Sequence, residues 1–398
     1  MTTKKKKKKD FKYWAGKAHL WLGLTSGLVV LFLAITGCLF VFSQEISNWA
    51  RHDEIYVPRI TATRIPVTQL WKQTQKAVGP ITITGVTTYN DPQKAIVFNS
   101  YKATEGSIWY FGNIEQFYSI YTDPYTGKVL GIYDEELDFF HIVKMLHWSL
   151  LLSHPIGQQI TGWATFIFVI MLITGIILWW PKNKAARKQR FSFQWKETTK
   201  WRRKNYDLHN ILGFYIASIA LIIALTGMVW AFSWFQAIVY VAGSGTITPP
   251  DIKYEKSVVV HDANKDMAIE KAYATVKQKY ADASGFSLTP AAATNSTAVI
   301  SVYVQQLEGV YYVNHSLQFD QYTGKLLNER RQEDKNFGEQ LIGANYDIHV
   351  GAILGIPGKI IAFVASFVCM LLPISGFLIW YGRNYKKGKT AKHSTASI

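Results

Sequence analysis

Four long stretches of the chain are almost free of charged residues, and polar sequence separates them. Each stretch can supply the roughly 20 apolar residues that a helix needs to cross a bilayer. Tryptophan and tyrosine gather at the ends of these stretches, as they do at the two interfaces of membrane proteins. The pattern predicts four transmembrane helices with apolar cores at Leu20–Phe42, Ile160–Trp180, Ile211–Phe235 and Ile360–Tyr381.

Two long polar loops follow the first and the third of these helices. Each loop contains a stretch predicted to be helical, Val67–Val78 in the first and Asp266–Tyr280 in the second. Alternating apolar and polar residues predict β-strands, for example at Ile81–Val86 and Val302–Val304. Each loop is therefore expected to fold as a small α+β domain.

The chain also repeats itself. Ala18–Gly23 recurs as Leu208–Gly213, and Ala34–Gly37 recurs as Ala224–Gly227, both at an offset of 190 residues. Each predicted helix carries at least one Thr-Gly or Ser-Gly pair, which suits close helix packing in lipid. The expected fold class is a membrane protein with four transmembrane α-helices in two duplicated halves, each half with its own α+β domain.

The formal net charge of +16 is unevenly distributed. The first 17 residues, residues 181–204 and the residues after Tyr381 hold 23 of the 43 Lys and Arg but two of the 27 acidic residues. Short basic segments mark the cytoplasmic side of a membrane protein. Both termini are therefore expected in the cytoplasm and both long loops outside. Contact with anionic lipids explains the basic runs better than nucleic-acid binding does.

Six of the ten histidines lie at or near the predicted membrane segments, where ionisable side chains are costly and usually functional. His19 and His209 begin the first and third helices, which run in the same direction, so both are expected at the cytoplasmic end. His147 and His349 precede the second and fourth cores, so both are expected at the outer end. Two imidazoles that face each other at one depth suit a haem with two axial histidines.

Other interpretations of the histidines stay open. A histidine at a helix start can be an interfacial or capping residue, and Asp207 and Asp347 are possible N-caps. His154 and His141 have no counterpart in the second half and are weaker candidates, although either could replace His147. The remaining histidines are expected at the surface: His52, His261, His315 and His393.

The distance of His147 and His349 from the apolar cores allows two arrangements. Either the second and fourth helices begin before their cores, or the two histidines lie on short pre-helices. In the second case the pre-helices would fold back at the Gly/Pro breaks Pro155–Gly157 and Ile356–Gly358.

Several motifs resemble those of the PepSY-associated transmembrane family, whose members are also called iron-regulated membrane proteins or ferric-siderophore reductases. The resemblance runs from about Trp14 to Tyr381. It rests on His19–Gly23, Leu146-His147, Leu208-His209 with Gly213, Ile348-His349 with Gly351, the Asp-Pro-Tyr-Thr-Gly-Lys sequence at Asp123–Lys128 and its looser copy at Asp320–Lys325.

The resemblance implies a di-haem b-type protein of the bacterial inner membrane that passes electrons outward to a ferric siderophore or another ferric chelate. Two b-type haems would have His19 with His209, and His147 with His349, as axial iron ligands. No C-x-x-C-H attachment motif surrounds Cys38 or Cys369, which agrees with b-type haem. The implied partners are the lipid bilayer, the ferric chelate, and an electron donor such as a quinol or a cytoplasmic reductase.

An alternative function is a membrane-anchored PepSY binding or regulatory protein, acting in peptidase inhibition or sensing without redox activity. The four-histidine pattern favours electron transfer, because an interaction module does not need it. A transporter is disfavoured because no acidic residue lies inside a predicted membrane core. No nucleophile–base motif is present, so no catalytic residue is assigned.

These patterns predict nine segments along the chain. They are a basic cytoplasmic tail (1–13), transmembrane helix 1 (14–45), a periplasmic PepSY-like domain (46–138), transmembrane helix 2 with an outer pre-helix (139–181), a basic cytoplasmic loop (182–205), transmembrane helix 3 (206–238), a second periplasmic PepSY-like domain (239–344), transmembrane helix 4 (345–382) and a basic cytoplasmic tail (383–398).

Overall fold

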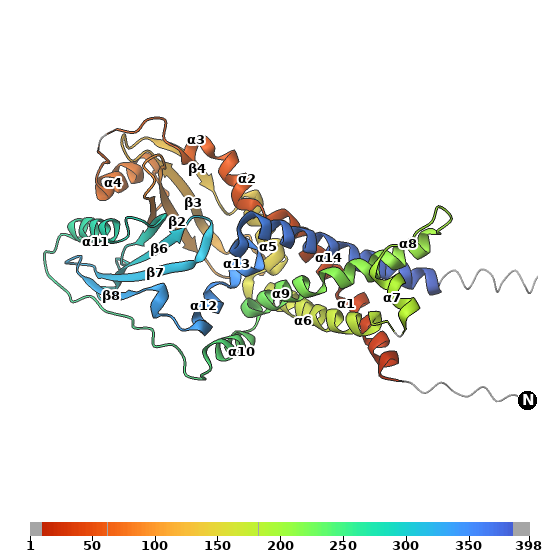
Figure 1. Cartoon of the computed structure of the whole chain (residues 1–398). Helices are drawn as coiled ribbons and strands as arrows, with labels where there is room; N and C mark the ends of the chain where they lie inside the picture. The colour runs from red at the N-terminus through yellow and green to blue at the C-terminus, as the bar shows by residue number, and fades with distance from the viewer. Residues whose placement is uncertain (1–9, 62, 182, 385–398) are drawn as a thin grey trace, which may run out of the picture.

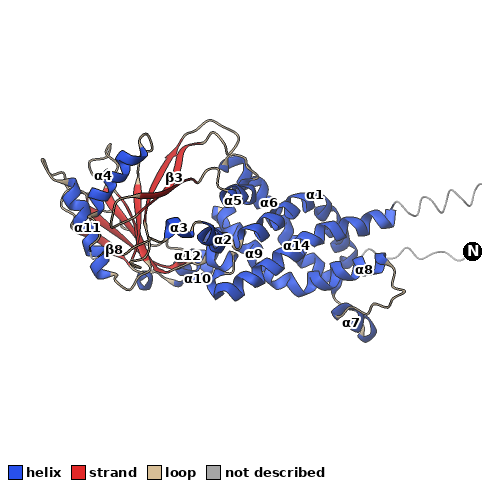
Figure 2. Ribbon diagram, turned by 90° about the horizontal axis from the view of Figure 1, so that it is seen from above, coloured by secondary structure: helices blue, strands red, loops and turns tan. Residues whose placement is uncertain are grey.

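A bundle of long helices and a β-sheet domain form the two ends of an elongated molecule (Figure 1). The structure is a computed structural model that describes residues 10–61, 63–181 and 183–384. Most of the two predicted basic tails, 1–13 and 383–398, lies outside the described residues. Both ends of the described chain lie at the end of the bundle that is remote from the sheet (Figures 1 and 2).

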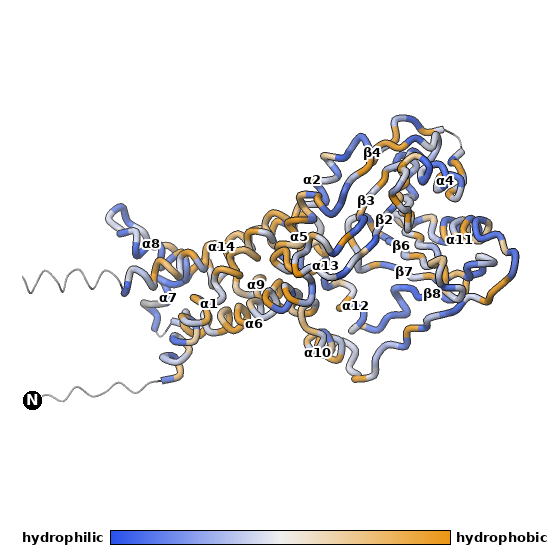
Figure 3. Tube along the Cα trace, turned by 180° about the vertical axis from the view of Figure 1, so that it is seen from behind, coloured by the Kyte–Doolittle hydropathy of each residue, from blue (hydrophilic) through white to orange (hydrophobic). Residues whose placement is uncertain are grey.

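Four helices of the described chain are long and apolar enough to cross a membrane, and each contains most of one predicted core. They span Phe11–Phe40, His154–Trp179, Trp201–Ala231 and Ala352–Asn384. In a bilayer, a helix satisfies its backbone hydrogen bonds internally, which favours this structure for an apolar segment. Figure 3 shows hydrophobic residues along most of the bundle and hydrophilic segments in the sheet domain and near α7 and α8.

The bundle is built from α1 (Phe11–Phe40), α6 (His154–Trp179), α9 (Gly213–Ala231) and α14 (Gly355–Asn384). Helix α1 packs against α6 and α14, and α9 packs against the same two helices. Shorter helical elements flank them: α2 (Ser43–Ala50), α3 (His52–Ile55), α5 (Phe139–Ser149), α7 (Lys184–Phe191), α8 (Trp201–Asp207), η1 (Leu208–Leu212), α10 (Ser233–Ser244), η2 (Gln332–Asp334), α12 (Phe337–Gly343), α13 (Asn345–His349) and η3 (Ala352–Leu354).

The two long loops build one continuous antiparallel sheet, with the strand order β4-β3-β2-β1-β5-β6-β7-β8. The strands are β1 (Gly85–Tyr89), β2 (Ile96–Ala103), β3 (Ile114–Thr122), β4 (Val129–Asp134), β5 (Gly285–Thr289), β6 (Val299–Leu307), β7 (Val310–Asp320) and β8 (Leu326–Arg330). Pairing of β1 with β5 joins the strands of the first loop to those of the second, and the hydroxyls of Thr87 and Ser287 lie 2.9 Å apart across this junction. The loops therefore share one sheet, where the sequence predicted two separate domains.

Helices α4 (Val67–Val78) and α11 (Lys265–Lys279) cover the face of the sheet that points away from the bundle (Figure 1). Phe98, Phe286 and Phe319 are fully buried in the core between them and the sheet. Both helices lie within one residue of the positions predicted from the sequence, 67–78 and 266–280. The strand predicted at 81–86 begins at Gly85 instead. The side chain of Gln75 donates a hydrogen bond to the carbonyl oxygen of Ile81 and accepts one from the N–H of Ile83, so these backbone groups are not free to pair with another strand.

The Asp-x-Tyr-Thr-Gly-Lys sequences form the hairpin turns that close β3–β4 and β7–β8. The Asp123 carboxylate accepts hydrogen bonds from the backbone N–H of Tyr125 and from the hydroxyl of Thr126, both at 2.8 Å. Gly127 has a φ of +72°, a conformation that costs other residues about 1–2 kcal/mol. The formation of this turn thus explains why the motif contains an aspartate, a threonine and a glycine at these positions.

The histidine-bearing segments before α6 and α14 are short pre-helices, which decides between the two arrangements left open by the sequence. Helix α5 ends at Ser149, just before Leu150 and Leu151, whose φ angles are +55° and +57°. The second pre-helix, α13, ends before Gly351, whose φ is +80°. Both breaks fall several residues earlier than the Gly/Pro positions that the sequence indicated.

Glycine permits the close approach that each fold-back requires. A Cβ atom on Gly157 would lie 2.0 Å from the carbonyl oxygen of Ser149, the last residue of α5. A Cβ atom on Gly358 would lie 2.1 Å from the carbonyl oxygen of Gly351. The start of each long helix therefore lies directly against the end of its own pre-helix.

Replacing Gly157 by Ala is expected to destabilise the protein by about 1–3 kcal/mol, because the added methyl group meets backbone that cannot rotate away. Gly343→Ala is the matched control, since a Cβ atom there meets nothing within 4 Å. Thermal unfolding in detergent, followed by tryptophan fluorescence, measures both variants. Equal melting temperatures for the two would show that the fold-back is not tightly packed.

Candidate functional site

The four candidate histidines form two pairs at different heights in the bundle. His19 on α1 faces His209 on the π-helical turn η1, with ring centres 6.4 Å apart. We call this the tail-side pair, because it lies toward the two chain ends. His147 on α5 faces His349 on α13, with ring centres 6.0 Å apart, and forms the domain-side pair.

The two pairs lie near opposite ends of the bundle. His19 and Gly37 are both on α1, and Gly37 lies beside the ring of His147. Their 18-residue separation corresponds to about 27 Å along a helix. That length is close to the roughly 30 Å thickness of a bilayer's hydrocarbon core.

Each of the four imidazoles has the same kind of hydrogen-bond partner. In every case the Nδ1 atom lies about 3 Å from the hydroxyl oxygen of a Thr or Ser on a neighbouring helix. The pairs and distances are His19–Thr174 at 3.0 Å, His147–Thr36 at 2.9 Å, His209–Ser375 at 2.9 Å and His349–Thr226 at 2.9 Å.

A glycine follows each of these hydroxyl residues and leaves room for the imidazole edge. A Cβ atom on the glycine would lie between 3.2 and 3.6 Å from the histidine Cε1 atom in all four places. Four of the Thr-Gly and Ser-Gly pairs in the predicted helices are thus the contact points of the histidines. From the sequence they were assigned to helix packing alone, although their recurrence at equivalent positions of the two halves was the available signal.

The local helix geometry differs between the two members of the tail-side pair. His19 lies within regular α-helix, whereas His209 lies in a single π-helical turn between α8 and α9. Such turns insert an extra residue into a helix and occur often at functional sites. The turn changes the direction in which the His209 side chain leaves the helix.

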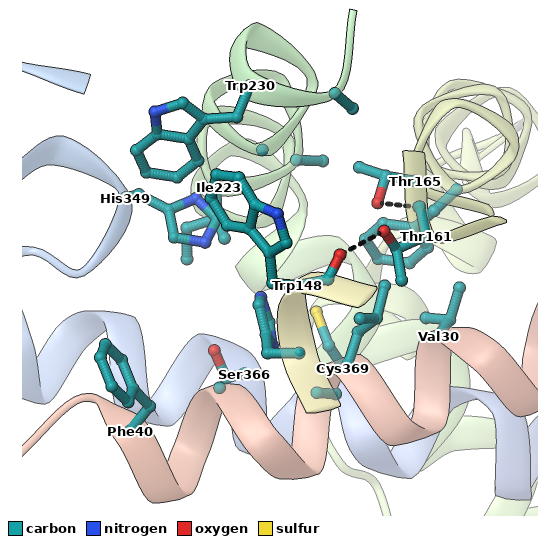
Figure 4. Close-up of a pocket in the computed structure, with 18 of the residues that line it drawn as sticks. Val30, Phe40, Trp148, Thr161, Thr165, Ile223, Trp230, His349, Ser366 and Cys369 are labelled. Carbon is teal, nitrogen blue, oxygen red and sulfur yellow. Dashed lines mark hydrogen bonds between the residues drawn. The ribbon is translucent and has the colours of Figure 1, made fainter. Parts of the chain in front are cut away.

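A cavity of about 470 Å³ adjoins the domain-side pair. His349, Trp148 and Trp230 project toward it in Figure 4, and the Trp230 and His349 ring centres are 5.3 Å apart. Most of the lining is apolar. Among the described residues that line it, Lys144 carries the one formal charge.

The two weaker candidates lie outside the pairs. His154 is exposed at the start of α6 and contacts the ring of Trp148. His141 lies between Tyr110 and Phe117, with ring centres 5.8 and 5.1 Å away. The structure therefore places His147, and neither of these two, opposite His349.

Two sequence-based expectations are wrong. His315 is buried, because it lies on the core face of β7 and its ring stacks on Tyr280. Asp207 and Asp347 are not N-caps, because both lie within continuous helical backbone. The Asp347 carboxylate instead accepts the backbone N–H groups of Tyr311 and Tyr312, at 2.9 and 2.7 Å. His52 is exposed, His261 lies in an exposed turn, and His393 is outside the described residues.

Each histidine pair offers a metal two protein ligands. Within residues 10–61, 63–181 and 183–384, no group of three or more His, Cys, Asp and Glu side chains is placed to hold a metal ion. Two imidazoles suit a metal that arrives with its own equatorial ligands, as the iron of a haem does.

Comparison with known proteins gives one family. The model described as "PepSY-associated TM region" matches residues 17–383, which is most of the chain. No curated protein matches the chain.

His141 is expected to make the protein acid-sensitive. Burial, assisted by the charge of Lys144, lowers the pKa of His141 to about 4, whereas an unfolded histidine has a pKa of about 6.5. The unfolded chain therefore takes up a proton between pH 6.5 and 4 that the folded protein does not, and stability falls over this range. His141→Phe should reduce the loss of stability between pH 7.5 and 5 by about 1 kcal/mol, allowing for partial exposure.

Thermal unfolding at the two pH values measures this difference. His52→Gln is the control, because His52 is exposed. An unchanged pH dependence in His141→Phe would contradict the assignment.

Proposed function

Since the chain belongs to the PepSY-associated TM region family, we propose that it is a di-haem b-type transmembrane electron-transfer protein. It reduces a ferric siderophore or another ferric chelate and thereby releases Fe(II). The observation that carries the proposal is the pair of facing histidines at each end of the bundle.

The spacing of the imidazoles fits axial ligation. A bond from a metal to an imidazole nitrogen is about 2.0 Å long. The centre of the imidazole ring lies about 1.1 Å behind that nitrogen. Two imidazoles on opposite sides of one iron would therefore have ring centres about 6.2 Å apart. The two pairs measure 6.4 and 6.0 Å. Both values fit one metal between the rings.

The hydrogen bonds and the cavity support the same proposal. Because each Nδ1 atom is engaged by a hydroxyl, Nε2 is the nitrogen left for a metal, as is usual for ligating histidines. The apolar cavity beside His147 and His349 suits a flat hydrophobic group. Lys144 would balance the negative charge of a haem propionate there. A bound haem would supply one-electron chemistry, and the protein would fix its position.

The proposed orientation places the basic end of the bundle in the cytoplasm and the sheet domain in the periplasm of a bacterial inner membrane. The short basic segments support this orientation. The sequence repeats and the matching elements of the two loops support an origin by duplication of one half. Electrons would enter from a quinol or a cytoplasmic reductase at the tail side and leave at the domain side.

The reaction balances with one electron for each iron. One Fe(III) accepts one electron and becomes Fe(II), so a two-electron quinol donor would serve two ferric ions and release two protons. Hard oxygen ligands bind Fe(II) less tightly than Fe(III), because the charge of the ion is lower, and the chelate therefore releases its iron.

Purified protein should contain close to two b-type haems per chain, measured by pyridine haemochrome and by the reduced-minus-oxidised spectrum. Replacing His19 or His209 by Ala should remove one haem, and replacing His147 or His349 should remove the other, because each site loses an axial ligand. His154→Ala, at an exposed position outside both pairs, is the control and should keep two.

Failure to find haem in protein made with ample haem supply would refute the electron-transfer proposal and favour a membrane-anchored PepSY binding or regulatory protein. Loss of both haems from each single variant, with the fold intact by thermal unfolding, would refute the assignment of ligand pairs.

Chemically reduced protein in liposomes should be reoxidised by a ferric siderophore added on the side of the sheet domain, with one Fe(II) formed per electron lost. A coloured Fe(II) chelator measures the product, and the haem spectrum measures the electrons. The gallium form of the same siderophore is the control, because Ga(III) has similar size and charge but accepts no electron under these conditions. Reoxidation at equal rates with both would exclude iron as the acceptor.

A further inference from the structure

We propose that the four hydroxyl–glycine pairs are positioning elements that hold each imidazole protonated on Nδ1 and hold the two rings of a pair crossed. The hydroxyl–glycine pairs are Thr36-Gly37, Thr174-Gly175, Thr226-Gly227 and Ser375-Gly376. The effect on a bound haem rests on the proposed function, whereas the protonation state of the histidines belongs to the protein itself.

Each hydroxyl already donates its proton within its own helix. The Thr36 hydroxyl donates to the carbonyl oxygens of Phe32 and Leu33, at 2.7 and 3.1 Å. The other three hydroxyls make the same bonds to the carbonyls three and four residues before them. The hydroxyl oxygen is then left with lone pairs, so Nδ1 of the facing histidine must donate.

The same argument holds at all four places, because each Nδ1 atom lies about 3 Å from a hydroxyl oxygen whose proton is already donated. All four Nε2 atoms are thereby left without a proton and available to a metal.

The hydroxyl–glycine pairs also fix the rotation of each ring. The ring planes are 89° apart in the tail-side pair and 71° apart in the domain-side pair. Within each pair the two rings contact different helices: His19 contacts α6 and His209 contacts α14. One hydrogen bond at Nδ1 and one glycine beside Cε1 leave each ring little freedom to turn.

The space between the glycine and the histidine ring differs between the two sites. An added Cβ atom would lie 3.3 Å from His19 at Gly175 and 3.2 Å from His209 at Gly376, which is closer than ordinary contact. At Gly37 and Gly227 the distances to His147 and His349 are 3.5 and 3.6 Å, which are ordinary contacts. The tail-side pair is therefore the more tightly confined of the two.

Crossed axial imidazoles have an electronic consequence. They leave two iron d orbitals nearly equal in energy, which gives ferric low-spin haem a strongly anisotropic EPR signal at low field. Parallel imidazoles separate these orbitals and give an ordinary rhombic signal. A hydrogen bond from Nδ1–H also raises the basicity of the ligand and strengthens its bond to the metal.

Thr36→Val removes the hydroxyl of one hydroxyl–glycine pair and keeps its shape. It should weaken haem binding at the domain-side pair about 10–100-fold, the usual effect of removing a partner of a metal-ligating histidine. It should also move that site's EPR signal away from the low-field form and leave the tail-side signal unchanged. Thr36→Ser should restore both properties, and Thr174→Val should have the corresponding effect at the tail-side pair.

Thr25→Val is the matched control. Thr25 is on the same helix and donates its hydroxyl to the carbonyls of Trp21 and Leu22, but it is exposed and is not one of the four hydroxyls that lie against a histidine. Wild-type haem affinity and EPR signals in both Thr36→Val and Thr174→Val would overturn the inference. Equal effects of Thr25→Val and Thr36→Val would do the same.

A second measurement does not need haem. In haem-free full-length protein with ¹⁵N-labelled histidine, the chemical shifts of the four imidazoles should show a proton on Nδ1 and none on Nε2. Absence of haem from the wild-type protein would refute the proposed function and leave this result intact. A proton on Nε2 would overturn the present inference whether or not haem binds.

The glycines provide a graded test. Gly376→Ala should shift the tail-side EPR signal, because the methyl group presses on His209, whereas Gly37→Ala should change the domain-side signal little. A larger change in Gly37→Ala than in Gly376→Ala would contradict the proposed control of ring orientation.

Discussion

The hydrogen bond from an imidazole to a hydroxyl on the neighbouring helix is the interaction on which the bundle depends. Water is absent from a bilayer core, so a buried imidazole needs a partner within the protein. The bonds are exchanged reciprocally: His19 on α1 reaches Thr174 on α6, and His147, just before α6, reaches Thr36 on α1. Helices α9 and α14 exchange the same bonds. Each helix pair is thus fixed near both ends, and two imidazoles from different pairs meet at each end.

Buried polar contacts hold the sheet domain over the domain-side pair. Asp347, two residues before His349, accepts two backbone N–H groups from β7. On the other side of the domain, Arg51 binds Glu135 and Asp138, at 2.7 and 2.9 Å. Partly buried ion pairs such as these contribute little net stability, but removing one partner is costly. The sheet is therefore held at a fixed distance from His349.

Local chemistry explains why much of this fold was predictable. A membrane-spanning helix must be long and apolar, and this requirement is visible at Leu20–Phe42 without any knowledge of its neighbours. The turn at Asp123–Lys128 is equally local, because its aspartate and glycine act within a few residues. The direction of the helices and the sequence repeats predicted which histidines share a depth in the membrane. The structure brings His19 to His209 and His147 to His349.

The sequence by itself determined the four helices, the turns and the histidines that share a depth, because each depends on composition or on spacing along one element. Tertiary structure decided the rest. The joining of β1 to β5, the pre-helix break at Leu150 and the burial of His315 depend on segments far apart in the chain. The role of the Thr-Gly and Ser-Gly pairs is of this kind too. A hydroxyl and a glycine suit many helix contacts, and they position an imidazole only because folding brings a histidine from another segment against them.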